Sequence, residues 1–258
     1  MSDTYSIPDK KENNGLCGLQ NIGNTCYMNT IIQCISNCQL FKEYFNDKKF
    51  VDPLITNIKE KEKGEIDMKC IYNKFNNTLT YQLFRIIKVM GKANDCTLSI
   101  NTFKNLFGNK INSFYGYGQH DTDEILVFLF MTIENEINVK GDYYIENVCP
   151  DVKKLMDIRD TYIKYIKENN LIEDQKEKIF AEYNQYKSDN KIAVRNIEAY
   201  KSWKTYNTNN RNIIMDLFAG YFHEETICPE CNNIIDKFDS FEFLNLTLGS
   251  DSNLVCKR

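Results

Sequence analysis

Cys26 is the residue of this chain whose position most favours chemistry. It follows the turn-forming run Gly23-Asn24-Thr25 and opens a segment with helical spacing, which predicts Cys26 in the first turn of a helix. Helix N-termini carry partial positive charge and unpaired N–H groups, which favour a thiolate and can hold an oxyanion. Asn21 can add a side-chain amide to such an oxyanion hole. The alternative is that Cys26 is a small buried residue at a helix start.

Asp121 and Glu124 form a second polar group at the predicted start of another helix. Their spacing resembles a capping box with Asp in place of Ser or Thr. Two carboxylates beside a groove can also pair with the arginines of a ligand. The two roles are compatible.

A Cys-x-x-Cys pair, Cys228 and Cys231, supplies half of the ligands of a structural zinc site. The chain has no second pair of this kind, and the nearest candidates for further ligands are His223 and Cys256. The sequence therefore offers only part of the ligand set of a structural zinc site. A redox role would need a strand–helix setting that the surrounding residues do not indicate.

The elements that must position these groups can be read from hydrophobic spacing. Apolar residues recur at helical intervals from Met28 to about Phe45, within 71–90 and from 121 to 137. Residues 151–200 are charged and aromatic, which predicts one or two long, partly exposed helices with breaks near 169–170 and 188–190. Residues 213–248 are rich in Ile, Phe and Thr and predict strands around the Cys-x-x-Cys knuckle.

Composition excludes several classes of protein. The 258 residues carry 42% hydrophobic and 26% charged residues and a net charge of −4, typical of a globular chain and unlike a protein with a basic nucleic-acid or membrane face. The longest apolar run, 125–131, is too short to cross a bilayer, and the N-terminus lacks a secretory signal. Ten cysteines without such a signal predict reduced thiols and an intracellular protein, cytoplasmic or nuclear or both.

Three ordered motifs resemble the ubiquitin-specific proteases. They are the cysteine box Gly18-Leu19-Gln20-Asn21-Ile22-Gly23-Asn24-Thr25-Cys26-Tyr27-Met28-Asn29, the glutamine box Gln119-His120-Asp121-Thr122-Asp123-Glu124-Ile125-Leu126, and the finger entry from Trp203 to Leu248. The resemblance implies that Cys26 is a nucleophile and Asn21 an oxyanion donor. It also implies that Gln119, Asp121 and Glu124 bind substrate, with the two acids contacting the arginine-bearing tail of ubiquitin.

The resemblance further implies an α+β, papain-like fold of the thumb–palm–fingers kind, here incomplete. We expect a flexible arm at 1–14 and a partial catalytic domain at 15–258. Within that domain, 15–150 would form the thumb, 151–200 a charged helical insertion and 201–258 the start of the fingers.

The general base is the missing part. The family supplies it as a His in a later Gly-His-Tyr block, and nothing in this sequence matches that block. His120 fits the glutamine box and His223 the finger entry, so neither is expected to act as the base. A fragment of a thiol-dependent deubiquitinase, marginally stable alone, is the favoured reading. The alternatives are a catalytically dead ubiquitin-binding module and a structural or zinc-dependent interaction protein.

The expected partners follow from the same resemblance. They are ubiquitin or ubiquitinated proteins, with neither nucleic acid nor membrane, and no cofactor is required for the thiol chemistry.

Overall fold

The computed structural model of the chain describes residues 17–62, 66–93, 95–139, 150–168, 173–232 and 234–246. Their helices are α1 (Cys26–Ser36), α2 (Gln39–Asn46), α3 (Val51–Lys61), α4 (Met68–Asn76), α5 (Leu79–Met90), α6 (Asn101–Lys110), η1 (Asn112–Phe114), α7 (Thr122–Ile137), α8 (Pro150–Glu168), α9 (Glu173–Asp189), α10 (Lys191–Asn209) and α11 (Ile213–Phe218). Their strands are β1 (Cys17–Leu19), β2 (Cys96–Leu98), β3 (Gly220–Ile227) and β4 (Ile234–Phe241). The fold is α+β and rich in helix, as predicted. No helix in the described part of the chain is long and apolar enough to cross a bilayer.

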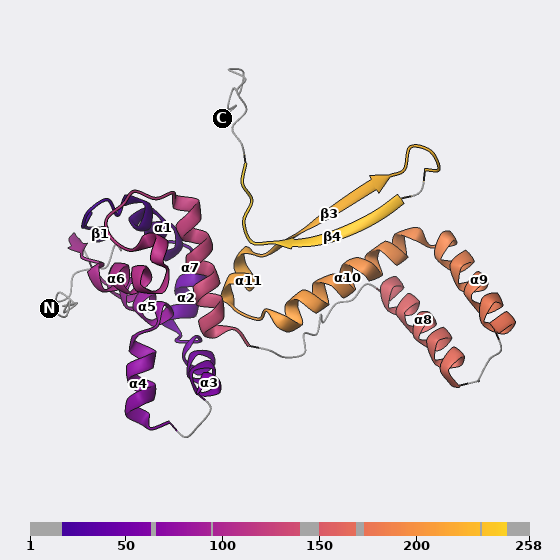
Figure 1. Cartoon of the computed structure of the whole chain (residues 1–258), viewed down its shortest axis with the longest axis horizontal. Helices are drawn as coiled ribbons and strands as arrows, with labels where there is room; N and C mark the ends of the chain where they lie inside the picture. The colour runs from indigo at the N-terminus through magenta and orange to yellow at the C-terminus, as the bar shows by residue number, and fades with distance from the viewer. Residues whose placement is uncertain are drawn as a thin grey trace, which may run out of the picture.

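The first body of the molecule is a bundle in which α1, α5 and α7 contribute buried faces to one core, with α2, α6 and α11 around them (Figure 1). The helices bury one apolar stripe each, which is the usual source of helix stability in a globular protein. The hydrophobic residues with an exposed fraction of 0% are Ile32, Phe41, Phe45, Leu79, Leu83, Ile86, Ile100, Phe103, Phe107, Leu129, Ile133 and Ile214.

Two of the predicted helices are each divided in two. The helix expected from Cys26 to about Phe45 ends at Ser36, because Cys38 is extended and turns the chain so that α2 packs its own buried face into the core. The segment 71–90 contains the end of α4 and all of α5. Thr78 separates them and accepts a hydrogen bond from the Tyr81 N–H as the N-cap of α5.

A buried carboxylate joins α7 to the start of α5. Glu136 accepts hydrogen bonds from the backbone N–H groups of Leu79 (3.1 Å) and Thr80 (2.8 Å) and forms an ion pair with Lys110 (3.1 Å). The two N–H groups and Lys110 compensate the negative charge of Glu136. In return, Glu136 accepts from two of the N–H groups that a helix leaves unpaired at its N-terminus.

A short parallel sheet precedes the cysteine box. β1 pairs with β2, and Cys17 lies opposite Cys96. The sheet then feeds the 20–25 loop, whose Gln20 N–H donates to the carbonyl of Leu98 (2.9 Å). Strands of three residues carry no periodicity that a sequence pattern could reveal.

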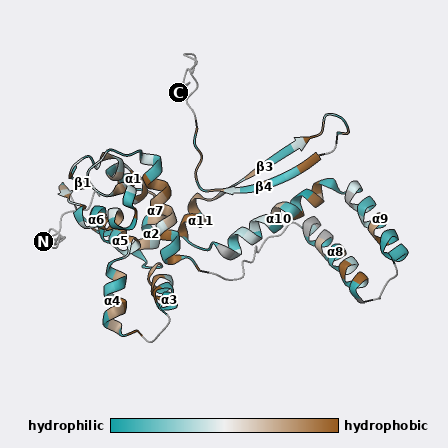
Figure 2. Ribbon diagram, in the orientation of Figure 1, coloured by the Kyte–Doolittle hydropathy of each residue, from teal (hydrophilic) through white to brown (hydrophobic). Residues whose placement is uncertain are grey.

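The charged segment forms three helices, where the sequence predicted one or two. α8, α9 and α10 extend away from the bundle, and the α9–α10 junction falls at Asn190 (Figure 1). The predicted break at 169–170 lies outside the described residues. Figure 2 colours α9 mostly hydrophilic, and among the described residues of this segment only Ile197 is a buried hydrophobic.

The strand prediction for 213–248 is wrong at its beginning. Residues 213–218 form α11, because Asn212 caps the N–H groups of Ile214 and Met215 and three apolar side chains enter the core. β3 and β4 then pair as an antiparallel hairpin with Gly220 opposite Phe241. A Cβ at Gly220 would lie 2.4 Å from the Phe241 ring, so the close packing of this ring on β3 requires glycine. Neither strand pairs with any further strand in the described part of the chain.

Candidate active site

The loop before Cys26 is built around the side chain of Asn21. Asn21 Oδ1 accepts hydrogen bonds from the backbone N–H groups of Gly23 (3.3 Å) and Thr25 (3.0 Å) and from the Thr25 hydroxyl (3.3 Å). The same hydroxyl accepts from the Ile22 N–H (3.2 Å). The amide oxygen of Asn21 is thus fully engaged, while its Nδ2 donates to no atom of the described residues. That end of the amide is exposed and available to a ligand.

The cysteine box meets the turn that precedes the glutamine box at Tyr117. Asn24 Nδ2 donates to the carbonyl of Tyr117 (3.0 Å), although the two residues are 93 positions apart. Gly23 has a φ of +112°, and a Cβ there would lie 2.7 Å from the Tyr117 ring. The close approach therefore requires glycine for both conformation and space.

Cys26 is the first residue of α1, as predicted, and its side chain is exposed. Its neighbours Tyr27 and Met28 are buried, which fixes the start of the helix. Thr25 occupies the N-cap position but makes no side-chain cap bond, and the first turn holds no acidic residue. The N-terminal N–H groups of α1 can therefore serve a developing negative charge next to the thiol.

The three substrate-binding candidates lie at the start of α7. Gln119, Asp121 and Glu124 are exposed, and none of their side chains hydrogen-bonds to another described residue. Asp121 is the N-cap of α7 by backbone conformation, but its carboxylate makes no cap bond. The capping box expected from its spacing with Glu124 is therefore not formed, and both carboxylates are left for a ligand.

His120 holds the start of α7 against α1. Its ring lies 5.2 Å from that of Tyr27 and 4.6 Å from that of Phe114, measured between centroids. The imidazole thus packs beside the residue that follows Cys26. It forms no hydrogen bond with Cys26 Sγ.

His223 lies in the β3–β4 hairpin, far from α1 (Figure 1). Its Nε2 is 2.6 Å from Asp236 Oδ1 on the neighbouring strand. Arg195 of α10 forms ion pairs with the same Asp236 (2.8 Å) and with Glu225 (2.7 Å). Hydrogen bonds from His223 and Arg195 lower the pKa of Asp236. These groups join α10 to the hairpin and leave Cys26 without a histidine partner in the described structure.

Cys228 and Cys231 lie at the turn between β3 and β4. Backbone N–H groups of Cys231 and Glu230, together with the Cys231 side chain, lower the pKa of the Cys228 thiol. A thiolate held in this way suits a metal ligand. His223 is five residues back along an extended strand, roughly 17 Å away, so it does not complete the set. Cys256 lies outside the described residues.

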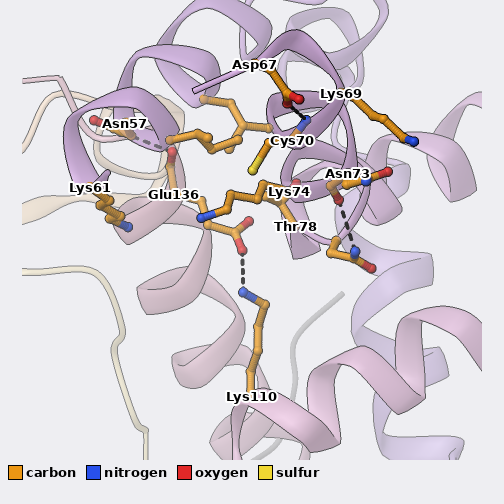
Figure 3. A pocket seen from close by; sticks show the side chains of 13 residues that line it. Asn57, Lys61, Asp67, Lys69, Cys70, Asn73, Lys74, Thr78, Lys110 and Glu136 are labelled. Carbon is orange, nitrogen blue, oxygen red and sulfur yellow. Dashed lines mark hydrogen bonds and ion pairs between the residues drawn. The ribbon is translucent and has the colours of Figure 1, made fainter. Parts of the chain in front are cut away.

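Two cavities of the described structure lie beside α3. One of ≈ 630 Å³ opens between α3 and α4, and Figure 3 shows Lys61, Lys74, Lys110 and Glu136 among its walls. Another of ≈ 810 Å³ lies between α3 and the end of α7. Neither contains a candidate site residue.

Tyr117 and Asn24 are the site residues whose contacts sequence reasoning missed. Asn24 lies inside the cysteine box, but nothing in its type or spacing points to Tyr117. Turn-rich composition around Gly116 and Gly118 was the one available signal that 112–120 folds tightly against another element.

Comparison with known proteins gives one family. A model of the ubiquitin carboxyl-terminal hydrolase family matches residues 17–248. The chain is 26% identical to the probable ubiquitin carboxyl-terminal hydrolase R319 of Acanthamoeba polyphaga mimivirus over an alignment of 278 positions. The alignment covers 92% of this chain and 58% of that protein.

Two vertebrate proteins are similar over comparable lengths. Identity is 29% over 246 residues to ubiquitin carboxyl-terminal hydrolase 15 of Xenopus tropicalis and 27% over 239 residues to ubiquitin carboxyl-terminal hydrolase 4 of Pongo abelii. The matches cover 95% and 91% of this chain but 20% and 19% of those proteins. The chain therefore spans only part of the length of each of these relatives.

Proposed function

Because this chain belongs to the ubiquitin carboxyl-terminal hydrolase family, we propose that it carries the nucleophile of a thiol-dependent deubiquitinase, with Cys26 attacking the carbonyl of ubiquitin's C-terminal glycine. The observation that carries the proposal is the arrangement around Cys26. An exposed thiol stands at a helix N-terminus beside a loop tied to the start of α7 through Asn24 and Tyr117.

The reaction has two steps. The Cys26 thiolate adds to the glycine carbonyl carbon, and the oxyanion is held by the Cys26 N–H and by Asn21 Nδ2. Collapse expels the amine of the conjugated protein, which takes up a proton, and leaves a thioester between ubiquitin and Cys26. Water then adds to that thioester, loses a proton to a base and releases free ubiquitin. No cofactor takes part.

The substrate tail lies along the start of α7 in this proposal. The exposed carboxylates of Asp121 and Glu124 pair with arginines of the ubiquitin tail, and Gln119 offers its amide to the tail backbone. The diglycine end needs no side-chain pocket, which agrees with the exposure of Cys26.

In this proposal, neither histidine of the chain is the general base. The chain has two histidines; His120 is packed between rings and His223 is bound to Asp236 in the hairpin. We therefore propose that these 258 residues supply the nucleophile half of the site and that another segment or chain supplies the base. The same observation favours the second candidate function, a module that binds ubiquitin without hydrolysing it.

A structural zinc ion is compatible with half of a site. Cys228 and Cys231 would hold it as thiolates at the hairpin tip, and two further ligands are needed. No step of the reaction runs through it.

The partners proposed are ubiquitin and ubiquitinated proteins in the cytoplasm or nucleus. Intact mass after mixing the chain with ubiquitin that carries a C-terminal electrophile tests the proposal. The expected result is one ubiquitin added to the native chain and none to Cys26→Ala. Ubiquitin binding with no adduct, in a chain shown to be folded, would favour the binding module instead.

A further inference from the structure

Two thiols face each other in the small sheet that precedes the cysteine box. Cys17 and Cys96 are register partners in the parallel pairing of β1 with β2, and their Sγ atoms are 2.9 Å apart. The two residues are 79 positions apart in the sequence. Their contact is therefore made by the fold and not by local chain geometry.

The backbone geometry suits a covalent bond between them. Neighbouring strands lie about 4.8 Å apart, within the Cα separation of about 4.4–6.8 Å that disulfides span. An S–S bond is about 2.05 Å long, so the sulfur atoms must approach by roughly 0.9 Å. Side-chain rotation can supply part of that movement, and the strands supply the remainder.

We propose that Cys17 and Cys96 form a redox-active dithiol, which a peroxide converts to a disulfide that staples β1 to β2. The proposal concerns a site separate from Cys26 and does not depend on the proposed deubiquitinase activity.

The two sulfurs differ in access. Cys17 is buried, and burial together with the hydrogen bond to Cys96 raises the pKa of its thiol to about 12. Cys96 is half-buried and is the sulfur that a small oxidant can reach first. Reactivity of thiols follows thiolate character and exposure, so Cys96 attacks and Cys17 resolves.

The chemistry balances in two steps. The Cys96 thiolate attacks hydrogen peroxide: an S–O bond forms, the O–O bond breaks, and hydroxide leaves and is protonated to water. Cys17 then attacks the sulfur of the resulting sulfenic acid. The S–S bond forms, the S–O bond breaks, and the Cys17 proton leaves with the hydroxyl as a second water. Two thiols lose two electrons, and one peroxide gains them.

The staple would fix the strand that leads into the loop of Asn21. β1 is already held there, because Gln33 Nε2 donates to the Cys17 carbonyl (2.9 Å) and Gln20 N–H to the Leu98 carbonyl (2.9 Å). A covalent link between residues so far apart in sequence also restricts the unfolded chain. Oxidation should therefore raise the melting temperature, by about 5 °C or more.

The experiment treats the full chain with hydrogen peroxide, blocks the remaining thiols and maps tryptic peptides without reduction. Peptide 93–104 holds Cys96 as its one cysteine, and peptide 12–42 holds Cys17 together with Cys26, Cys34 and Cys38. The expected product joins these two peptides, is lost on reduction, and is absent in Cys17→Ser and in Cys96→Ser. It persists in the control Cys34→Ser, which removes an exposed thiol of the same peptide.

The pair Cys228 and Cys231 reports whether the oxidant acted. If those two thiols are oxidised while peptide 93–104 is recovered only as the free thiol or as sulfinic acid, the proposal is wrong. It is equally wrong if the cross-link survives in Cys17→Ser, because the partner of Cys96 would then be another cysteine. Circular dichroism of each serine variant, with Cys17→Ala as a second variant, separates loss of the link from loss of the fold.

Discussion

Asn21 uses the two ends of its amide for two purposes. Its oxygen closes the loop by accepting from Gly23, Thr25 N–H and the Thr25 hydroxyl, and its nitrogen is left for the oxyanion. The two purposes can be separated, because aspartate keeps the acceptor and removes the donor.

We predict that Asn21→Asp lowers the rate of acyl transfer from a ubiquitin C-terminal thioester to Cys26 by about 100-fold, with little change in stability. The negative charge that aspartate adds also lowers this rate, because it repels the oxyanion. Asn21→Ala should lose the rate and also about 1–3 kcal/mol of unfolding free energy, because two backbone N–H groups lose their acceptor. Quenched-flow mass spectrometry and urea unfolding measure the two effects. An unchanged rate in Asn21→Asp would remove Asn21 from the oxyanion hole.

Asp121 and Glu124 are predicted to act on binding and not on folding. Asp121→Asn and Glu124→Gln should each weaken ubiquitin binding by about 10-fold at low salt, or about 1.4 kcal/mol, and by less as salt screens the charges. Melting temperatures should barely change, because neither carboxylate makes a bond within the described structure. Asp123→Asn is the matched control: it is exposed in the same turn and carries the same charge. Equal weakening by the control would mean that only the overall charge matters.

Sequence patterns predicted the positions of single residues in the helices better than their contacts. The cysteine box placed Cys26 at a helix start, which the structure shows. The same patterns gave Asp121 and Glu124 a capping role that they do not fill, since spacing alone cannot tell whether a carboxylate turns back to the helix or outward. The anchoring role of the Asn21 oxygen also had no signal in the sequence.

At the scale of elements, a contact between two loops helps to hold the site together. The cysteine box and the residues before α7 touch where Asn24 bonds to the Tyr117 carbonyl and Gly23 lies under the Tyr117 ring. This contact and the packing of the His120 ring on Tyr27 together hold the start of α1 against the start of α7.

Gly23→Ala tests that contact. The new Cβ would lie 2.7 Å from Tyr117 Cδ1 at a backbone φ of +112°, so we expect a loss of about 2–3 kcal/mol in unfolding free energy and a large loss of acyl transfer. Gly116→Ala is the control, because its φ is +91° but nothing lies within 4 Å of the added carbon. It should lose about 1 kcal/mol and keep its rate. Similar losses of rate in both variants would contradict the loop contact.

The long amphipathic helix α7 was predictable, while the ends of other helices and the short α11 were not. The apolar stripe of α7 is present in the sequence, and Leu129, Phe130 and Ile133 are buried as expected. The division of 26–45 at Cys38 depends on how α2 packs in three dimensions, and the helical pattern continues through it. α11 is short and apolar, so a strand and a buried helix look alike there until Asn212 is seen to cap it.

At the scale of the whole molecule, three parts meet around Glu134. This side chain on α7 accepts from Asn212 Nδ2 (3.2 Å), and the Tyr206 hydroxyl on α10 donates to Glu242 (2.6 Å) at the end of the hairpin. Burial, and then the charge of Glu242, raise the pKa of Glu134 to about 7, while the bond to Asn212 opposes the rise. The junction of the helical bundle, α10 and the β3–β4 hairpin thus contains a carboxyl group with a raised pKa.

This junction predicts a pH dependence of stability. A carboxyl group whose pKa is higher folded than unfolded stabilises the fold while protonated, and that stability is lost as pH rises from about 4.5 to about 7. Because Glu134 is partly exposed, we expect a fall of about 1–2 kcal/mol between pH 5 and 7.5. Glu134→Gln should remove this part of the slope, and Glu60→Gln, an exposed glutamate on α3, should not. Urea unfolding at both pH values measures it, and an unchanged slope in Glu134→Gln would refute the assignment.

The joining of the parts is what the sequence could not provide. Composition distinguished the charged segment from the apolar helices, but the ion pairs of Arg195 with Glu225 and Asp236 connect residues 30 or more positions apart. No local pattern encodes such a contact.

The most direct test of the central claim, that Cys26 is a nucleophile positioned for the ubiquitin C-terminus, is intact mass after mixing the chain with a ubiquitin C-terminal thioester at pH 8.5. A thioester needs little help to lose its thiol, and at this pH exposed thiols ionise without a histidine base. We predict one ubiquitin attached at Cys26 as a thioester that accumulates, because no base activates water. It should be lost in Cys26→Ala and kept in Cys34→Ala, which removes another exposed thiol. Attachment that persists in Cys26→Ala, or no attachment to a folded chain, would contradict the claim.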